Sequence, residues 1–245
     1  MASPIQCFYL PTANPWLNLA LEHFYLLEYP KKNDEVFLFL YENQNSIILG
    51  RSLEKEKEVY LHKPLPPVIR RLSGGGTVSH FKGNLNYGIL LSLDHYADLF
   101  EIHKSYEQIL GAIIDGFKNT MPLHKQGLSD LCLKQRGVFR KLSGNSQVRK
   151  RGWLLHHGTF MYSLQNLPKI KAWLRPPEKQ PDYRRKRSHD DFMIRGLPTV
   201  QRTQVMHNLV NGFRGWLGRE VRWSKIAVND VLFTRQNILP LYLKD

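Results

Sequence analysis

Apolar positions recur at three- and four-residue intervals in three parts of the chain, which is the period of an amphipathic helix. The first part starts at Asn14-Pro15, where Asn suits a helix N-cap and Pro suits the first turn, and it ends by Pro30. The second part covers 109–117 and the third covers 201–217. The pattern therefore predicts three helices.

Shorter apolar runs, bounded by Gly, Asn or charged turns, predict β-strands. These runs occupy 36–41, 46–49, 68–72, 77–81, 85–93, 131–133, 138–142 and 153–163. The runs 68–72 and 77–81 flank three consecutive glycines. The neighbouring runs 131–133 and 138–142 suggest a hairpin. Helices and antiparallel-looking strands are mixed, without a regular strand–helix–strand alternation. The sequence therefore favours an α+β (mixed α/β) fold over a doubly wound parallel sheet.

The region 170–187 breaks this regularity. It contains Pro176-Pro177 and the basic run Arg-Arg-Lys-Arg at 184–187. Because prolines interrupt regular structure and like charges favour solvent, we expect an irregular, basic, exposed loop here. The stretch that begins at Ile226 is apolar, and we expect it to pack back on the body of the protein.

The chain has 245 residues, a length that fits one large domain, or one domain with a small appendage, and allows a sizeable core. We expect a single domain over 1–245. Apolar residues make up 42%, and the 5 Trp, 11 Tyr and 12 Phe exclude a disordered chain. The formal charge is +14, from 35 Lys and Arg against 21 Asp and Glu. Such an excess favours an acidic partner: a nucleic acid, a phosphate-bearing small molecule, a membrane surface or an acidic protein.

The two cysteines, Cys7 and Cys132, are too few for a disulfide framework or a zinc cluster. This suits a reducing compartment. No uncharged run reaches the ~18–20 apolar residues that a membrane-spanning helix needs. The N-terminus also lacks the pattern of a secretory signal and the arginines of a transit peptide. We therefore expect a cytoplasmic protein without membrane association.

The most informative motif lies at 70–80, which reads Arg-Arg-Leu-Ser-Gly-Gly-Gly-Thr-Val-Ser-His and continues to Gly83-Asn84. Three adjacent glycines are costly to order, because each loses more backbone freedom than another residue would. They suit a close approach of backbone N–H groups to a bulky or anionic ligand, with the two arginines as donors to phosphate or carboxylate. A tight turn beside a solvated arginine pair explains the same residues without a ligand. The spacing matches neither a P-loop nor a dinucleotide fingerprint.

Two further motifs place polar side chains on predicted strands. Asp130 is followed by Lys-Leu-Ser-Gly-Asn at 141–145, which puts a Lys at a strand end beside a turn. Such a Lys can stabilise an oxyanion or a phosphate, but an exposed Lys beside an ordinary turn is the alternative. The pair His156-His157 lies in an apolar strand, where neighbouring side chains face opposite ways. Since no Cys/His cluster completes a metal site, hydrogen-bonded structural roles suit both histidines better.

Taken in order, these motifs resemble the lipoate–protein ligases of the biotin/lipoate ligase superfamily. The resemblance extends over most of the chain, roughly from Asn14 to Arg195. Its parts are Asn14-Pro15-Trp16-Leu17-Asn18-Leu19-Ala20-Leu21-Glu22, Ile47-Ile48-Leu49-Gly50-Arg51, the arginine–glycine motif, Asp130, Lys141-Leu142-Ser143-Gly144-Asn145 and His157-Gly158-Thr159. The ordered set is more specific than any one motif. It implies a biotin/lipoate ligase-like catalytic domain, with a mixed, largely antiparallel sheet flanked by helices.

Members of this family activate a short acyl acid with ATP, release pyrophosphate and pass the acyl group from the acyl-adenylate to a lysine of a lipoyl carrier domain. The resemblance implies ATP, Mg²⁺ and lipoate or octanoate as ligands. Lys141 would be the catalytic residue that bridges the acyl carbonyl and the α-phosphate, and Arg71 would contact the phosphates. The residues that would contact the nucleotide or acyl-adenylate are Arg71, Ser73, Gly74, Gly75, Gly76, Thr77, Val78, Ser79, Asn84 and Lys141.

The same resemblance implies a metal and an acyl subsite. Asp130 would help to hold Mg²⁺ near the phosphates. Tyr41, His80 and His157 would line an apolar tunnel for the acyl chain, although ordinary core packing explains them as well. The implied partners are the lipoyl carrier domains of 2-oxoacid dehydrogenase complexes or the glycine cleavage carrier protein.

The chain departs from the family pattern after the helix predicted at 201–217. Many members continue into an accessory C-terminal domain of about a hundred residues, a typical small-domain size. We expect a catalytic domain without that accessory domain. It would act alone, need a separate accessory subunit for adenylation, or perform only the transfer half-reaction.

Two other functions compete with the ligase. An ATP-independent octanoyl- or lipoyltransferase of the same superfamily would hold the acyl group on a cysteine. Cysteine-dependent relatives carry it shortly before the position of Asp130, where this chain reads Leu-His-Lys-Gln-Gly at 123–127, and Cys132 lies in an apolar run that suits burial. A basic nucleic-acid-binding module would explain the charge of +14. No helix-turn-helix, zinc-finger or RNA-recognition signature supports it, so nucleic acid is the less favoured partner.

Overall fold

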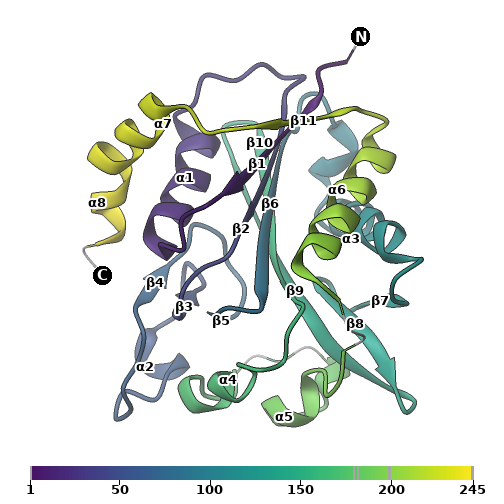
Figure 1. Ribbon diagram of the computed structural model, residues 1–245. Coiled ribbons are helices and arrows are strands. Elements are labelled where there is room, and N and C mark those ends of the chain that lie inside the picture. Colours follow the sequence, from purple (N-terminus) through teal and green to yellow (C-terminus); the bar gives the residue numbers. More distant parts are fainter. Residues whose placement is uncertain (1, 179, 181, 198–199, 244–245) are drawn as a thin grey trace.

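A mixed sheet of eight strands runs through the centre of the protein (Figure 1). The structure is a computed structural model that describes residues 2–178, 180, 182–197 and 200–243. In spatial order the strands are β11 (Val221–Ser224), β1 (Ile5–Leu10), β2 (Val36–Tyr41), β6 (Asn84–Ser92), β10 (Trp153–Met161), β9 (Val138–Lys150), β8 (Asp130–Gln135) and β7 (Leu123–Gln126). Strand β1 pairs in parallel with β11 and with β2, and all other pairs are antiparallel. The predicted α+β fold with a largely antiparallel sheet is confirmed.

A second sheet of three strands lies beside one end of the large sheet (Figure 1). Its order is β4 (Val68–Arg70), β3 (Ser46–Leu49) and β5 (Val78–His80). Strand β3 is parallel to β4 and antiparallel to β5. The short strands predicted around the three glycines therefore exist, each a little shorter than expected. We call the segment between β4 and β5, residues 71–77, the glycine loop.

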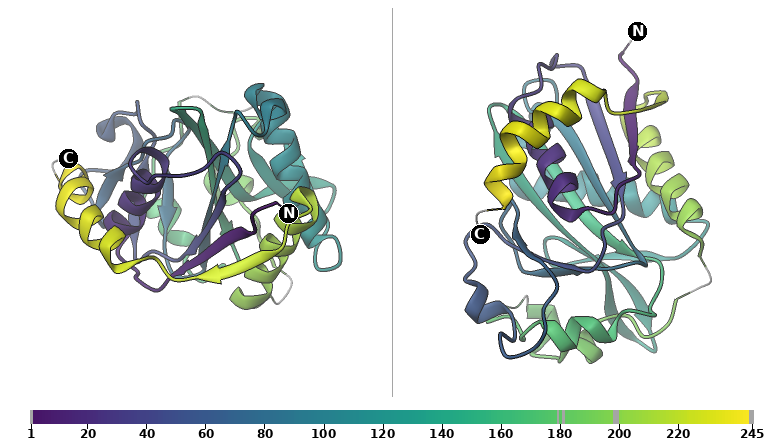
Figure 2. Two further views of the ribbon diagram at one scale, coloured as in Figure 1. Left: turned by 90° about the horizontal axis from the view of Figure 1, so that it is seen from above. Right: turned by 60° about the vertical axis from the view of Figure 1, so that its left-hand side comes forward.

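One face of the large sheet is covered by α1 (Pro15–Leu27) and the C-terminal helices α7 (Val228–Phe233) and α8 (Leu239–Tyr242), as Figure 2 shows from above. Helix α1 begins as predicted, because the Asn14 side chain accepts a hydrogen bond from the backbone N–H of Leu17 at 3.0 Å. The C-terminal stretch docks against α1: Tyr242 is buried, and the Tyr25 hydroxyl donates to Asp230 at 3.0 Å.

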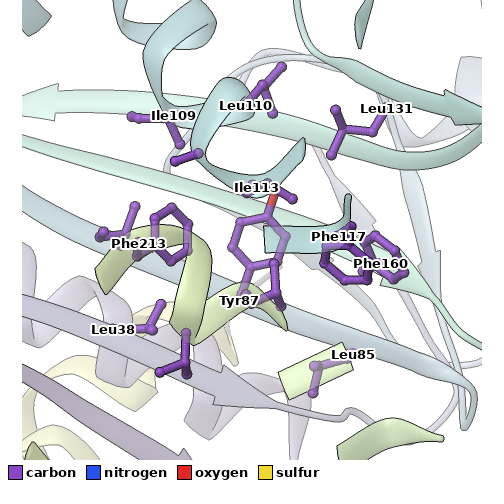
Figure 3. Close-up of a cluster of buried hydrophobic side chains, with 14 of the residues drawn as sticks. Leu38, Leu85, Tyr87, Ile109, Leu110, Ile113, Phe117, Leu131, Phe160 and Phe213 are labelled. Atoms are coloured by element: carbon purple, nitrogen blue, oxygen red, sulfur yellow. The ribbon is translucent and has the colours of Figure 1, made fainter. Parts of the chain in front are cut away.

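The other face is covered by α3 (Ile102–Phe117) and α6 (Arg202–Leu217), which pack on the sheet through a large apolar cluster (Figure 3). In this cluster the rings of Phe117 and Phe160 stack with their centroids 4.5 Å apart. Strand β2 is buried on both faces, so its alternate residues serve different layers. Phe37 and Phe39 pack toward α1, whereas Leu38 packs toward α3 and α6. Each such side chain contributes about 1.5–3 kcal/mol of burial free energy.

The region predicted as an exposed loop is instead a partly helical cap. It contains α4 (Pro168–Trp173), a 3₁₀ turn (Asp182–Arg184) and α5 (His189–Phe192), which lie at the bottom of Figure 1 near α2 (Lys55–Glu58). Charged residues such as Arg185 and Lys186 are exposed as expected, but the expectation was wrong for Ile170, Leu174 and Arg184, which are buried. We call the described part of 168–195 the cap.

Three strands were not predicted: β1, β7 and β11. Two of them, β7 and β11, are four-residue edge strands with little apolar pattern. Among the described residues, none of the helices has both the length and the apolarity to cross a membrane.

Candidate active site

A pocket of about 340 Å³ lies between the two sheets and the cap. Strands β5, β6, β9 and β10 and the glycine loop form one side, which we call the floor, and the cap forms the other. The apolar part of its lining consists of Leu19, Tyr41, Ile48, Val78, Leu128, Leu142, Met161, Ile170, Leu174, Pro177, Phe192 and Met193. A pocket with a large apolar wall and a few convergent polar groups is typical of a site for an amphipathic small molecule.

The side chain of Arg71 holds the glycine loop in place. Arg71 is buried, and its Nη2 donates to the backbone oxygens of Gly74 at 2.6 Å and Gly76 at 2.8 Å. Its Nη1 donates to the oxygen of Ile48 at 3.2 Å, and its Nε donates to Ser73 Oγ at 2.8 Å. Burial lowers the pKa of Arg71 to about 10. The guanidinium thus spends four of its five donors on the protein.

Two glycines are needed by the shape of this loop. Gly75 has φ +84°, a conformation that favours glycine. Gly50 faces it so closely that a Cβ would come within 2.0 Å of the Gly75 backbone oxygen. The loop therefore exposes main chain rather than side chains to the pocket, as expected for close approach to a ligand.

Lys141 and Asp130 form an ion pair in the wall of the pocket. The distance from Lys141 Nζ to Asp130 Oδ1 is 2.8 Å, and the Tyr183 hydroxyl of the cap donates to Asp130 Oδ2 at 2.5 Å. The Asp130 side chain is 8% exposed and that of Lys141 is 26% exposed. The cationic head of Lys141 is therefore held in place and still accessible from the pocket.

Lys141 lies within a long strand, which differs from the predicted strand end. Strand β9 continues to Lys150, and its register against β8 shifts at Leu131 and Cys132, so that Leu142 is an extra, bulged residue. Gly144 makes room for the lysine: a Cβ there would lie 2.8 Å from both Cε and Nζ of Lys141. The Lys-Leu-Ser-Gly spacing thus has a physical cause.

The motif around the paired histidines also depends on a glycine. Gly158 lies opposite Asn145 across β9 and β10, and a Cβ at 158 would come within 2.0 Å of Asn145 Oδ1. This contact lets the Asn145 oxygen accept a hydrogen bond from the Tyr87 hydroxyl, while its Nδ2 donates to the Ser129 oxygen at 2.7 Å. The two sequence motifs are therefore parts of one wall.

His157 belongs to a buried chain of hydrogen bonds behind the glycine loop. Its Nδ1 lies 2.8 Å from Glu22 Oε2 and its Nε2 lies 2.6 Å from Ser73 Oγ. Since Nδ1 faces a carboxylate, it carries the proton, and Nε2 accepts from Ser73. The order Glu–His–Ser matches that of a nucleophilic triad. However, Ser73 Oγ also accepts from Arg71 and does not line the pocket, so this chain positions the loop.

His80 lies in a second buried chain at the other end of the floor. It bonds to Asn43 Nδ2 at 2.9 Å through Nδ1 and to Thr159 Oγ1 at 3.0 Å through Nε2. Burial, followed by the positive charge of Arg71, lowers the pKa of His80 to about 3. The ring is therefore neutral at physiological pH and suits a pocket that takes an apolar chain.

Most of the sequence-predicted residues meet at this pocket. Those that line it are Tyr41, Arg71, Gly75, Gly76, Thr77, Val78, Ser79, His80, Asn84, Asp130, Lys141 and His157. Ser73 and Gly74 lie behind the loop surface, where both are bound to Arg71. As predicted, His156 and His157 have separate structural partners: His156 Nδ1 lies 3.0 Å from Gln147 Nε2.

The donors present do not fit a Mg²⁺ site built by the protein. Both oxygens of Asp130 are already bound, one by Lys141 and the other by Tyr183. Among the residues with described positions, no group of three or more His, Cys, Asp or Glu side chains could hold a metal ion. Assigning Mg²⁺ to Asp130 stays a prediction, and no step below depends on it.

Three residues of the site were missed by sequence reasoning. Glu22 orients His157 from α1, and Tyr183 and Arg184 reach the pocket from the cap. Glu22 had a signal: a carboxylate within the apolar face of a predicted helix is rarely buried without a partner. The two cap residues had none, because their position depends on how the cap folds over the pocket.

Comparisons with known proteins identify the family of the chain. The family model for the lipoyl protein ligase A/B catalytic domain matches residues 14–214. Lipoate-protein ligase A of Blochmanniella floridana is 31% identical over 184 residues, 72% of this chain and 50% of that protein. Lipoate-protein ligase LplJ of Bacillus subtilis is 33% identical over 159 residues, 61% of this chain and 43% of that protein. The chain thus spans about half the length of the curated relatives it matches.

Solved structures show the same fold. A bi-partite lipoate protein ligase from Thermoplasma acidophilum superposes with a TM-score of 0.76 at 23% identity, over 95% of this chain and 91% of that one. A lipoate-protein ligase A bound with ATP superposes with a TM-score of 0.74 at 22% identity, over 96% and 94% of the two chains. At such identities the likeness establishes the architecture, and the chemistry has to be argued from the pocket.

Proposed function

Because the chain belongs to the family of lipoyl protein ligase A/B catalytic domains, we propose that it activates lipoate or octanoate with ATP and transfers the acyl group to a lysine of a lipoyl carrier domain. The observation that carries this proposal is the cationic head of Lys141, held beside an apolar wall and a loop of exposed backbone. An acyl-adenylate needs these three features: an apolar site for the chain, N–H donors, and a positive charge between carbonyl and phosphate.

The first half-reaction joins the acid to the nucleotide. An oxygen of the acyl carboxylate attacks the α-phosphorus of ATP, the bond to the β-phosphate oxygen breaks, and pyrophosphate leaves. Lys141 holds the carboxylate and the α-phosphate together and compensates the negative charge that develops between them. The backbone of Gly76, Thr77 and Val78 lies along the bound adenylate. Arg71 acts indirectly, because its donors hold that backbone in place.

The second half-reaction forms the amide. The amine of a carrier lysine attacks the acyl carbonyl, the bond to the phosphate oxygen breaks, and AMP leaves. Lys141 stabilises the negative charge on the carbonyl oxygen during this attack. We propose as carriers the lipoyl domains of 2-oxoacid dehydrogenase complexes or the glycine cleavage carrier protein. The Thermoplasma acidophilum ligase was described with its E2 lipoyl domain, and the net charge of +14 here suits an acidic partner.

The decisive experiment measures lipoate-dependent exchange between ATP and pyrophosphate, followed by transfer to an apo carrier domain. Lys141→Ala should lower the rate by about 10²–10³-fold, which corresponds to about 2–4 kcal/mol of transition-state stabilisation, with an unchanged melting curve. A fully active Lys141→Ala protein would exclude this role. Transfer only from pre-made lipoyl-AMP would indicate that adenylation needs a separate subunit.

The same assay tests the transferase alternative. Cys132 is fully buried, and burial raises the pKa of its thiol to about 12, so it lacks the accessible thiolate of an acyl-carrying nucleophile. Cys132→Ala should therefore retain at least half of the activity. ATP-free transfer from octanoyl-carrier protein that disappears in Cys132→Ala would replace the ligase with the transferase.

A further inference from the structure

The pocket contains a second buried arginine, and its guanidinium is incompletely bound. Arg184 lies in the cap, lines the pocket and is only 4% exposed. Its Nε donates to the backbone oxygen of Arg187 at 3.0 Å. Its Nη2 is buried and has no hydrogen-bond partner in the described part of the chain. A guanidinium stays charged in proteins, and a buried donor without an acceptor costs about 1–3 kcal/mol.

Charge around Arg184 is also uncompensated. The cations beside the Phe192 ring are Lys141, Arg184 and Arg187, whose Nζ or Cζ atoms lie 5.9, 4.6 and 5.4 Å from its centroid. Burial lowers the pKa of Arg184; Tyr183 and Asp130 oppose this effect, and Asp130 already pairs with Lys141. The cap carboxylates Asp190 and Asp191 pair elsewhere, with Lys171 and Arg195. Among the described side chains, Asp130 is the carboxylate recorded beside these three cations.

Arg187 shows that the cap could have satisfied such a side chain internally. Its Nη1 donates to the Phe139 oxygen and its Nη2 to the Tyr183 oxygen, both at 3.0 Å, and its Nε donates to the Arg184 oxygen at 3.0 Å. Arg187 thus fixes the turn that carries Arg184. The fixed turn directs the Arg184 side chain into the pocket and leaves its Nη2 without an acceptor among the described residues.

We propose that Arg184 binds a phosphate group of the nucleotide, on the opposite side of the pocket from the glycine loop. A planar guanidinium donates two parallel hydrogen bonds to phosphate oxygens, and a polyphosphate carries enough charge to balance the local excess of two cations. The nucleotide as the source of the phosphate rests on the proposed function. The anion site itself depends only on the unpartnered guanidinium and its charged neighbours.

The cap is tethered in a way that makes this contact significant. Leu174 forms a β-bridge to Val59 at one end of the cap, and Met193 forms one to Lys141 at the other. The backbone N–H of Ile194 also donates to the Lys141 oxygen at 3.0 Å. Arg184 lies between these two anchors, so a phosphate bound by it links the middle of the cap to the reacting groups at Lys141.

The test compares Arg184→Gln with Arg185→Gln, in which the same charge is removed from the exposed neighbouring residue. Calorimetry of the full chain with ATP, with inorganic pyrophosphate and with lipoate gives three dissociation constants for each variant. We expect Arg184→Gln to weaken ATP and pyrophosphate binding roughly 10- to 100-fold and to leave lipoate binding within two-fold. Arg185→Gln should change all three by less than about three-fold.

Each other outcome has a definite meaning. If wild type binds ATP and Arg184→Gln binds it equally well, the inference is wrong while the proposed function stands. If pyrophosphate binding depends on Arg184 but no lipoate-dependent exchange occurs, the anion site stands and the ligase proposal fails. A purely structural role would weaken lipoate binding equally and lower the melting temperature by several degrees, and that result overturns the inference.

Discussion

The floor and the cap of the pocket satisfy their polar groups in different ways. On the floor, Arg71 is buried with four of its donors bound to Ser73 and to three backbone oxygens. In the cap, Arg184 is equally buried, but its Nη2 has no partner in the described residues. Both arginines line one pocket. Burial of a cation therefore does not by itself distinguish a structural residue from a ligand-binding one. The distinction depends on whether the protein supplies hydrogen-bond acceptors for its donors.

This difference follows from the scaffolds. The floor consists of paired strands, whose main chain positions residues to within a fraction of an ångström and supplies carbonyl oxygens in fixed directions. The cap consists of short helices and turns that bury few residues, so it has less protein with which to satisfy its charges. We infer that the polar groups of the floor have their hydrogen-bond partners before substrate binds. Those of the cap would gain their remaining partners from the substrate.

The largest difference between Arg71 and Arg184 is expected in the free energy of unfolding when each is replaced by Gln. Arg71→Gln removes the guanidinium donor from the backbone oxygens of Ile48 and Gly76, while Gly74 keeps the Ser146 hydroxyl at 2.8 Å. Because each unsatisfied buried group costs about 1–3 kcal/mol, the free energy of unfolding should fall by about 3 kcal/mol or more. Urea unfolding followed by circular dichroism measures it.

The matched variant is Arg184→Gln, which removes the same charge from the other wall. Since the side-chain hydrogen bond recorded for Arg184 with the described residues is the one through Nε, the free energy of unfolding of the variant should change by less than about 1 kcal/mol. Equal losses of unfolding free energy in the two variants would mean that both arginines are structural. The proposed difference between floor and cap would then be wrong.

The next effect is a loss of unfolding free energy at acidic pH, caused by two buried histidines of the floor. Burial, with nearby positive charge, lowers the pKa of both His80 and His156 to about 3. In the unfolded chain their pKa is near ~6.5, so between these values the unfolded state binds protons that the folded state refuses. The stabilisation is complete above pH ~6.5 and falls as the pH drops toward 3. At pH 5 each histidine should cost on the order of 2 kcal/mol.

Urea unfolding at pH 7.5 and at pH 5.0 measures this loss. His156→Gln keeps a side-chain acceptor for Gln147 and removes one titrating group. The difference in unfolding free energy between the two pH values should therefore shrink by on the order of 2 kcal/mol. An unchanged difference would show that His156 takes up its proton in the folded state.

Local pattern was enough to predict much of the floor. The strands around the glycine loop follow from short motifs, as does the N-cap of α1 at Asn14, and the family resemblance implied that Lys141 and that loop share one site; all are found. The role of Arg71 could not be predicted, because a sequence shows donors but not the acceptors that the fold places around them. The chain from Glu22 through His157 to Ser73 joins residues 135 and 84 positions apart, a distance that no local pattern bridges.

The cap was beyond prediction for a different reason. Its buried residues Ile170, Leu174 and Phe192 have no regular spacing and lie among prolines and charges, so the segment looks solvent-exposed. Ile170 and Leu174 are buried because they reach Ile47 on β3 and Val59 after α2, which are more than a hundred residues away, whereas Phe192 packs against Tyr183 within the cap. Tertiary packing overrides composition there, and the site residues that the cap carries could be found only with the fold.

The smallest effect on stability should come from Gly144. Although it lies on the floor, its substitution is expected to change the reaction rate rather than the stability, which is also expected to change little for the cap residue Arg184. In Gly144→Ala the new Cβ meets only the end of the flexible Lys141 side chain, at 2.8 Å from Cε and Nζ, so stability should change by less than about 1 kcal/mol. The displaced Nζ should still lower the rate of ATP–pyrophosphate exchange about ten-fold. Gly111→Ala, where a Cβ meets nothing within 4 Å, should leave the rate unchanged. Full activity in Gly144→Ala would show that the precise position of Lys141 does not limit the reaction. A large loss of stability would show that the structure around Gly144 in β9 cannot shift to accommodate the new Cβ.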